Sequence, residues 1–187
     1  IYHEHYNYWS LTSLVTFFKR FKAIIYKAEK INTHGGSLRI YVKKNLKTKI
    51  DKSVKSLLSE EEKFGIKKYQ TYQNFAKKVY KIRDSVRKNI LKLKENGTKI
   101  IGYGSPAKAT TALNFFGISD EIECIVEDNK LKQGKLLPGV KIPIVSKSDI
   151  KGKPDFALVL AWNFINEIKS KNVDLAHKFI SIKDLEN

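Results

Sequence analysis

The stretch IIGYGSPAK at residues 100–108 runs from an apolar strand pattern through a glycine-containing turn into a helix. Gly102 and Gly104 allow a tight turn and the close approach of a ligand to the backbone. Pro106 suits the first helical turn, where its missing N–H is no loss. The free N–H groups at such a helix start attract an anion, and Lys108 adds a positive charge one turn later. The stretch predicts a phosphate-binding loop, although an ordinary strand-to-helix turn would show the same pattern.

The sequence after Gly97 alternates short apolar runs with helical segments. We expect strands at 99–103, 122–126, 141–145, 155–161 and 178–182, and helices at 106–116 and 163–171. Strand–helix–strand alternation is typical of a parallel sheet with helices on its faces. Residues 98–187 are therefore predicted to form a small Rossmann-like α/β domain.

Polar side chains follow several of these predicted strands. The carboxyl ends of parallel strands meet at one edge of the sheet, where open α/β sheets bind their ligands. An acidic side chain about two dozen residues after the glycines would contact a ribose hydroxyl in such a fold. The sequence therefore predicts a nucleotide or phosphosugar site. Its candidate substrate-binding residues are Gly102, Tyr103, Gly104, Ser105, Lys108, Glu127, Asn129, Lys132, Trp162 and Asn163.

The first 97 residues are organised differently. Residues 11–21 have apolar side chains at helical spacing, and residues 22–30 and 37–43 are strand-like runs separated by a Gly-Gly pair, which predicts a hairpin. From Thr48 to about Gly97 the spacing is helical throughout, with one apolar stripe from Tyr69 to Leu93. The expected organisation is a helix-plus-hairpin segment, a helical connector and the α/β domain, at residues 1–45, 46–97 and 98–187.

The net charge of +17 has little bearing on nucleic-acid recognition. Only four of the 36 basic residues are arginine, and the lysines are spread along the whole chain. Nucleic-acid readers cluster their basic residues and favour arginine for bidentate contacts. We therefore expect no specific nucleic-acid partner, and only a general attraction for anionic ligands.

No apolar run approaches the roughly 20 residues needed to span a bilayer, so we expect no membrane partner. The first residues contain no basic region followed by an apolar run, which argues against a signal peptide and for the cytoplasm. The chain has no Met and opens abruptly on aromatic residues, which indicates a fragment. The lone cysteine, Cys124, lies in an apolar run and is interpreted as a small buried hydrophobic residue.

The segment Tyr2-His3-Glu4-His5-Tyr6 is dense in groups that transfer protons. Neutral His accepts a proton near pH 7, Glu can orient an imidazole, and Tyr can donate to a developing oxyanion. The spacing is not that of a His-Glu-x-x-His zinc site, so no metal is expected. Taken alone, the segment is either an acid–base cluster or a polar, aromatic-rich terminus.

Five blocks in order along the chain resemble the carboxyl-terminal region of S-adenosylmethionine-dependent sugar C-methyltransferases, the enzymes that make branched deoxysugars. The resemblance covers nearly the whole chain. The blocks are YHEHYNYWSL at 2–11, HGGSLRIYV at 34–42, GYGSPAKATTALNFFGI at 102–118, VEDNKLKQGKLLPGVKIPI at 126–144 and LAWNFINEI at 160–168.

The resemblance implies that residues 1–45 are the tail of a Rossmann-type methyl-donor domain, and that an upstream domain missing from this chain binds most of the S-adenosylmethionine. Residues 98–187 would bind the nucleotide-diphosphate sugar. The family's Tyr-x-Glu-His motif falls on Tyr2, Glu4 and His5. His5 would remove a proton next to a keto group of the nucleotide-linked deoxysugar, with Glu4 orienting it and Tyr2 near the keto oxygen. The resulting enolate would attack the donor methyl, and this chain alone would catalyse nothing.

The sequence departs from the family pattern at Ser105, Ala109, Glu127 and Lys130, where many relatives have Ala, Gly, Asp and Pro. Because of these departures, the resemblance does not identify the nucleotide base or the sugar of the substrate. Two alternatives remain: an enzyme that uses a dinucleotide at 102–108, such as a reductase, and a regulatory domain without methyl transfer. The absent third glycine and the small sheet argue against the reductase.

Overall fold

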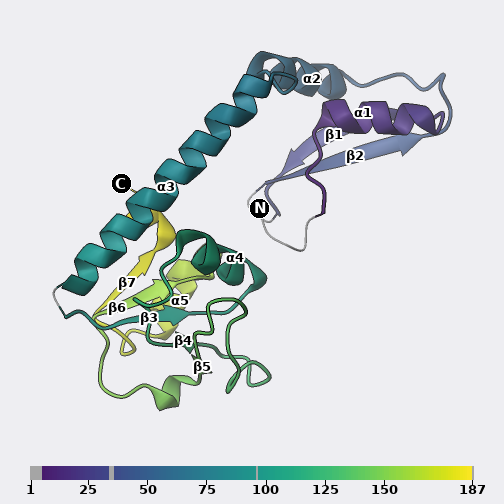
Figure 1. The fold of residues 1–187 in the computed structure, drawn as a ribbon. Coiled ribbons are helices and arrows are strands. Elements are labelled where there is room, and N and C mark those ends of the chain that lie inside the picture. Colours follow the sequence, from purple (N-terminus) through teal and green to yellow (C-terminus); the bar gives the residue numbers. More distant parts are fainter. Residues whose placement is uncertain (1–5, 34–35, 96, 187) are drawn as a thin grey trace. The chain divides into compact units, whose positions relative to one another are not determined.

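The computed structural model describes residues 6–33, 36–95 and 97–186. Figure 1 follows the chain through its helices and strands. The chain forms two compact units, Tyr6–Ala76 and the residues from Lys77 onward. The boundary between them lies within one long helix, α3 (Tyr69–Glu95).

The amino-terminal unit consists of helices packed on an antiparallel hairpin. Its elements are α1 (Leu11–Arg20), β1 (Ile24–Ile31), β2 (Ser37–Lys43) and α2 (Lys52–Phe64). A small core forms where the two helices meet the hairpin, from the buried side chains of Leu11, Ile25, Ala28 and Val54. The helix and hairpin predicted from the sequence are therefore present.

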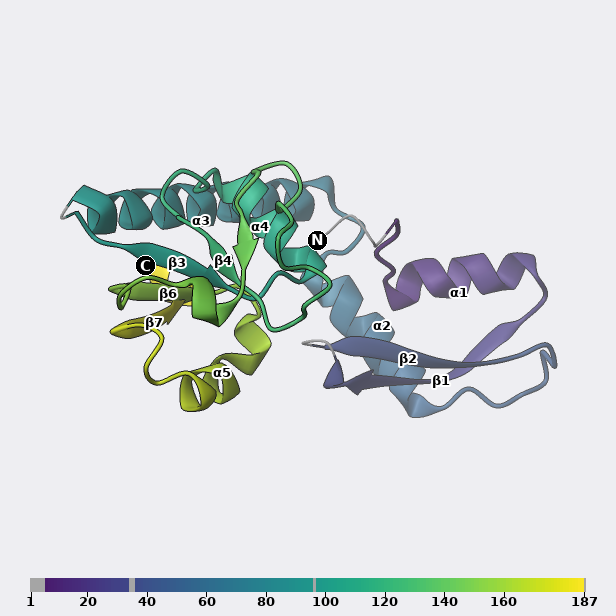
Figure 2. The ribbon, with the colours of Figure 1, turned by 90° about the horizontal axis from the view of Figure 1, so that it is seen from below.

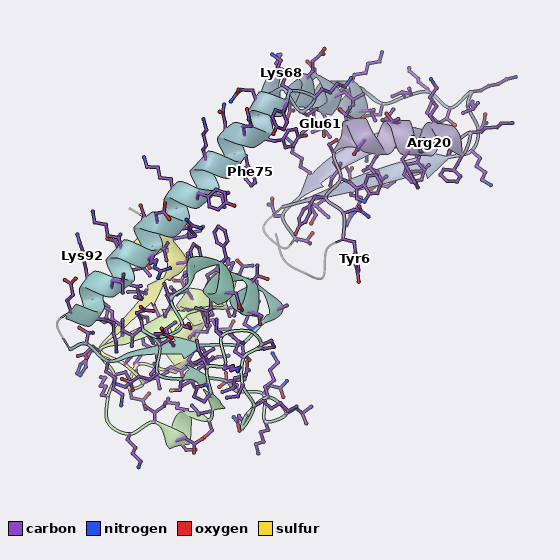
Figure 3. All side chains as sticks on the ribbon, in the orientation of Figure 1. Tyr6, Arg20, Glu61, Lys68, Phe75 and Lys92 are labelled. Carbon is purple, nitrogen blue, oxygen red and sulfur yellow. The ribbon has the colours of Figure 1, made fainter. Side chains whose placement is uncertain are left out.

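A carboxylate from α2 holds the start of α1. Glu61 accepts hydrogen bonds from the backbone N–H of Leu11 (2.6 Å) and of Thr12 (2.8 Å), and from the Thr12 hydroxyl (2.6 Å). Ser10 and Ser13 complete the cap by exchanging side-chain-to-backbone hydrogen bonds. The first N–H groups of a helix have no partner within the helix, so these contacts satisfy them and tie α1 to α2. Figure 3 labels Glu61 on α2.

The helical spacing predicted throughout residues 48–97 is interrupted in the structure. Gly65 ends α2 in a left-handed conformation (φ +79°), and α3 begins four residues later. The predicted apolar stripe of α3 is buried only in its second half. Val86 and Ile90 are fully buried, whereas Tyr72 and Phe75 are at least half exposed. The apolar stripe is therefore covered only at the later turns of α3, where it packs into the core of the carboxyl-terminal unit.

The carboxyl-terminal unit is built on a five-stranded parallel sheet. Its strands are β3 (Ile100–Tyr103), β4 (Ile125–Val126), β5 (Ile144–Val145), β6 (Phe156–Val159) and β7 (Lys178–Ser181), and its helices besides α3 are α4 (Ala107–Phe116) and α5 (Ile165–Lys171). The strand order is β5-β4-β3-β6-β7. The first strand thus lies in the centre, with later strands added outward on both sides, as in a Rossmann-like fold. The predicted α/β class is confirmed.

Alternate residues of β3 face opposite layers of this unit. Ile100 packs with Val86, Ile90 and the α4 residue Leu113 in one core. Tyr103 packs in a second core, against which Ile168 of α5 also lies. Figure 2 shows α3 and α4 on one side of the sheet and α5 on the other. All four residues of β3 are buried, as expected for a strand covered on both faces.

Within the described ranges, no helix combines the length and apolar character that crossing a membrane requires.

Replacing Glu61 by Gln tests the contact between α2 and α1. The variant leaves at least one N–H of α1 without an acceptor, so we expect the free energy of unfolding of this unit to fall by about 1–3 kcal/mol. The fluorescence of Trp9, followed in urea in a Trp162→Phe background, measures the transition. Glu60→Gln is the matched control, since Glu60 is exposed and forms a surface ion pair with Lys30; it should change stability by less than about 0.5 kcal/mol. Equal losses of stability in Glu61→Gln and Glu60→Gln would contradict the role of Glu61 in holding the start of α1.

Candidate functional site

A cleft of about 610 Å³ opens at the carboxyl ends of β3, β4 and β6 and along α5. Its position follows from the connections of the sheet. The chain leaves β3 into α4 on one face and leaves β6 into α5 on the other, and these strands are neighbours. The two connections therefore diverge and leave a crevice between them, which is where open α/β sheets bind ligands. Its volume lies within the range of small-molecule sites.

The turn between β3 and α4 forms one wall of this cleft. Gly104 has φ +83°, and a Cβ there would lie 3.1 Å from the Cβ of Ala161, so a side chain would be both strained and crowded. Pro106 precedes the first turn of α4, and its side chain makes no capping hydrogen bond to the helix start. The turn therefore presents a helix amino terminus at the cleft, as predicted for a phosphate loop.

Gly102 has a different role from the one predicted. It lies within β3, not in the turn, and is fully covered. A Cβ at this position would approach Ile125 Cγ1 to 2.9 Å and Leu160 Cδ1 to 3.2 Å. Gly102 thus allows close packing of β3 with its neighbours, and does not itself reach the cleft.

Glu127, directly after β4, fastens this strand end to the β3–α4 turn. Its Oε2 accepts from the Ser105 N–H (2.8 Å) and the Ser105 hydroxyl (2.5 Å), while Oε1 accepts from the Asn129 N–H (3.0 Å). Lys132 donates to the Ser105 carbonyl oxygen (2.9 Å) and lies 3.7 Å from Glu127 Oε2. We call this group the Glu127 clasp. It leaves the Glu127 side chain 13% exposed and uses one N–H of the predicted phosphate loop.

The Glu127 carboxyl is held in its ionised form. Burial acts to raise its pKa, but the hydrogen bonds from Ser105 and Asn129 and the charge of Lys132 outweigh it, so the pKa lies below its ordinary value. In the Glu127 clasp an ionised carboxylate therefore accepts hydrogen bonds from Ser105 and Asn129. Protonation of Glu127 would weaken it.

A second polar network lies on the α5 side of the cleft. The Tyr103 hydroxyl donates to Asp128 Oδ2 (2.9 Å) and accepts from the Asn172 amide (3.1 Å), which also donates to the Ile168 carbonyl oxygen (3.0 Å). Burial, followed by the hydrogen bond and charge of Asp128, raises the pKa of Tyr103 to about 12. Tyr103 therefore stays protonated and acts as a donor to Asp128.

Lys108 and Trp162 contact each other beside the cleft. The Lys108 ammonium lies over the indole ring, 4.3 Å from its centroid, in a cation–π arrangement. Burial lowers the pKa of Lys108. The contact joins the first turn of α4 to the 3₁₀ turn Trp162–Phe164 that follows β6.

The structure brings half of the predicted substrate-binding residues into the cleft lining. Those that line it are Tyr103, Gly104, Ser105, Glu127 and Lys132. Those that lie outside the lining are Gly102, Lys108, Asn129, Trp162 and Asn163. The catalytic candidates Tyr2, Glu4 and His5 lie outside the described residues.

Eight residues of the lining are not among the predicted substrate-binding residues: Pro106, Asp128, Ala161, Phe164, Glu167, Ile168, Lys171 and Asn172. Most of them lie on α5 or just before it. The spacing of Phe164, Ile168 and Asn172 by four residues was a usable signal, because it places them on one side of a helix. Among the described residues there is no group of three or more His, Cys, Asp or Glu side chains arranged to hold a metal ion.

Residues 32–181 match the family described as the C-methyltransferase C-terminal domain. The chain belongs to this family. The C-methyltransferase NovU of Streptomyces niveus is 34% identical over 171 residues, which are 90% of this chain and 41% of that protein. The chain thus spans less than half the length of this relative.

The Glu127 clasp predicts a pH dependence of stability. The pKa of Glu127 is lower in the folded than in the unfolded chain, so its contribution is complete above the ordinary value of 4.5 and is lost as the pH falls through the folded value. The stability difference between wild type and Glu127→Gln should be constant above about pH 5 and shrink below it. Urea unfolding across this range measures the difference.

Ser105→Ala provides the control for this experiment, because it removes one donor to Glu127 and keeps the carboxylate. Without this donor the pKa of Glu127 in the folded chain lies closer to its ordinary value. As the pH falls, the stabilisation contributed by the Glu127 carboxylate should therefore be lost at a higher pH than in wild type. A difference between wild type and Glu127→Gln that does not vary with pH would contradict the clasp.

Proposed function

We propose that this chain is the substrate-binding part of an enzyme that transfers a methyl group from S-adenosylmethionine to a carbon of a nucleotide-linked keto-deoxysugar. The observation that carries the proposal is the cleft at the carboxyl ends of β3, β4 and β6, with a helix start on one wall and carboxylates at the end of β4. Membership of the C-methyltransferase C-terminal domain family supports the reaction class. The similarity to NovU supports the same class.

The diphosphate of the substrate would lie against the turn Gly104–Pro106 and the start of α4. The helix dipole and the N–H groups at the very start of α4 favour an anion there, although the Ala109 N–H already donates to the Pro106 carbonyl oxygen (2.8 Å). Lys132 lines the same wall and donates one of its three ammonium hydrogens to Ser105, so its charge is fixed in place. The net charge of +17 would add a long-range attraction for an anionic substrate.

The sugar would be activated by the segment Tyr2–His5. A carbon atom becomes nucleophilic when a proton next to a carbonyl is removed, which requires a positioned base and stabilisation of the enolate oxygen. His5 would take the proton, Glu4 would orient its imidazole, and Tyr2 would donate to the keto oxygen. S-adenosylmethionine supplies the electrophilic methyl group.

The methyl donor would be bound mainly upstream of Ile1 in the intact enzyme. The described residues of Tyr6–Ala76 form helices and an antiparallel hairpin. They contain no pair of parallel strands, so they do not by themselves form the crevice in which an open α/β sheet binds a ligand. Methyl transfer by this chain alone is therefore not expected.

A titration of the chain with dTDP, GDP and NADH distinguishes a sugar-nucleotide site from a dinucleotide site. We expect at least one nucleoside diphosphate to bind more tightly than NADH. Lys132→Ala and Lys108→Ala should each weaken this binding about tenfold, a loss of about 1.4 kcal/mol. Lys92→Ala, a change on the exposed face of α3, is the control and should bind as wild type does. Preference for NADH, or full affinity in both lysine variants, would contradict the proposed site.

The role of His5 is tested in the intact enzyme by the exchange of the substrate proton with deuterated solvent. His5→Ala should abolish exchange, because no other group would be placed to remove the proton, and should leave binding of S-adenosylmethionine unchanged. Calorimetry measures the binding of S-adenosylmethionine, which serves as the control that the variant is folded. Exchange at the wild-type rate in His5→Ala would exclude His5 as the base.

A further inference from the structure

The cleft has two unlike walls beyond the phosphate turn. The Phe164 ring, which is 59% exposed, and Ile168 present apolar surface from the side of α5. Asp128 presents a carboxylate from the end of β4. A nucleoside has matching parts, since its base has an apolar face that stacks on aromatic rings and its ribose carries hydroxyl donors.

The two neighbouring carboxylates at the end of β4 have different tasks. Glu127 is largely covered, and both of its oxygens accept hydrogen bonds from the chain itself. Asp128 is exposed, and one of its oxygens accepts from Tyr103. An ionised carboxylate has about four acceptor positions, so Asp128 can accept further hydrogen bonds from a ligand.

The network behind Asp128 fixes it as an acceptor. Asn172, which is buried, donates to the Tyr103 hydroxyl, and Tyr103 donates to Asp128, so every hydrogen bond in the series points toward the cleft. The amide of Asn172 is itself held by its donation to the Ile168 carbonyl oxygen. Buried networks in which each member has its partners are rigid. Asp128 is therefore positioned before a ligand arrives.

We propose, on the basis of the nucleotide-sugar function above, that the nucleoside half of the substrate lies between Phe164 and Asp128. The base stacks on the Phe164 ring, and a ribose hydroxyl donates to the Asp128 carboxylate. Tyr103 and Asn172 act as positioning residues through Asp128, and Glu127 shapes the turn without contacting the ribose.

The ribose contact is tested by calorimetry with the chain, using whichever of dTDP, GDP, UDP and ADP binds most tightly and its 2′,3′-dideoxy analogue. In wild type, removal of the hydroxyls should weaken binding about tenfold or more, as for a hydrogen bond to a charged group. In Asp128→Asn the two ligands should differ less than about threefold, because the acceptor has been changed. Asp120→Asn, an exposed acid outside the cleft, is the control and should keep the tenfold difference.

The stacking contact is tested with Phe164→Ala. Affinity for the nucleoside diphosphate should fall about tenfold, and affinity for inorganic pyrophosphate should not change, because the base contributes only to the former. Phe21→Ala is the matched control, since Phe21 is also 59% exposed but belongs to the amino-terminal unit. It should bind both ligands as wild type does.

The outcomes separate the two proposals. If wild type binds a nucleoside diphosphate but does not distinguish it from the dideoxy analogue, or if the difference persists in Asp128→Asn, the ribose contact is wrong and the nucleotide-sugar function stands. Unchanged nucleotide binding in Phe164→Ala would likewise overturn the stacking contact alone. If no nucleoside diphosphate binds to wild type, both proposals are overturned.

Discussion

The structure of the cleft depends on the carboxylate of Glu127. β4 and β5 are only two residues long, and the end of β4 is held by backbone hydrogen bonds from the Gly104 N–H to the Val126 carbonyl oxygen (2.8 Å) and from the Glu127 N–H to the Val145 carbonyl oxygen (3.0 Å). The two hydrogen bonds that Glu127 accepts from Ser105 add a side-chain link between the end of β4 and the turn that begins α4, and a third, from the Asn129 N–H, holds the carboxylate in its own loop. Since the turn carries the helix start and the end of β4 carries Asp128, the same carboxylate sets the distance between the anion-attracting wall and the acceptor.

This arrangement changes the interpretation of the glycine-containing loop. In a phosphate loop all exposed backbone N–H groups are available to the ligand. Here the Ser105 N–H is occupied by Glu127, and Lys132 donates to the Ser105 carbonyl oxygen. The Glu127 clasp thus fixes the conformation of the turn. Its remaining attraction for an anion comes from the start of α4 and from the charge of Lys132. Such a site suits an extended ligand that makes several moderate contacts, as a nucleotide sugar does, because no single contact has to supply all of the affinity.

The order of elements was predictable from the sequence, and the interruptions were not. The strand–helix alternation after Gly97 gave the parallel sheet, because buried parallel strands are continuous apolar runs. The ladder at β4 is shorter than the apolar run 122–126, since Ile122 to Cys124 lie beside β3 without regular pairing. The break at Gly65 was hidden because helical spacing continues on both sides of it. Periodicity reports which faces are apolar, and it does not report where the backbone leaves the helix.

The sequence predicted that the site lies at the carboxyl ends of the strands, but it did not predict all of the side chains that line it. Sequence position identified the acidic pair after β4, but successive side chains of an extended chain point in opposite directions. Which of Glu127 and Asp128 faces the ligand is therefore decided by packing, and the sequence prediction selected Glu127, the carboxylate that the chain uses itself. The contribution of α5 was missed for a related reason. Its residues reach the cleft only because β6 leaves the sheet toward the opposite face from β3, which is a property of the assembled fold.

Nucleotide binding in the crevice between the β3–α4 turn and α5 is the property on which the proposed function depends. The most direct test is to follow the backbone amide signals of the ¹⁵N-labelled chain by NMR while dTDP, and in a second titration GDP, is added. We expect the largest shifts at Gly104, Ser105, Asp128 and Ile168, with little change along the exposed face of α3. Shifts that gather on the lysines of α3 or in the amino-terminal unit, with none in the cleft, would contradict it.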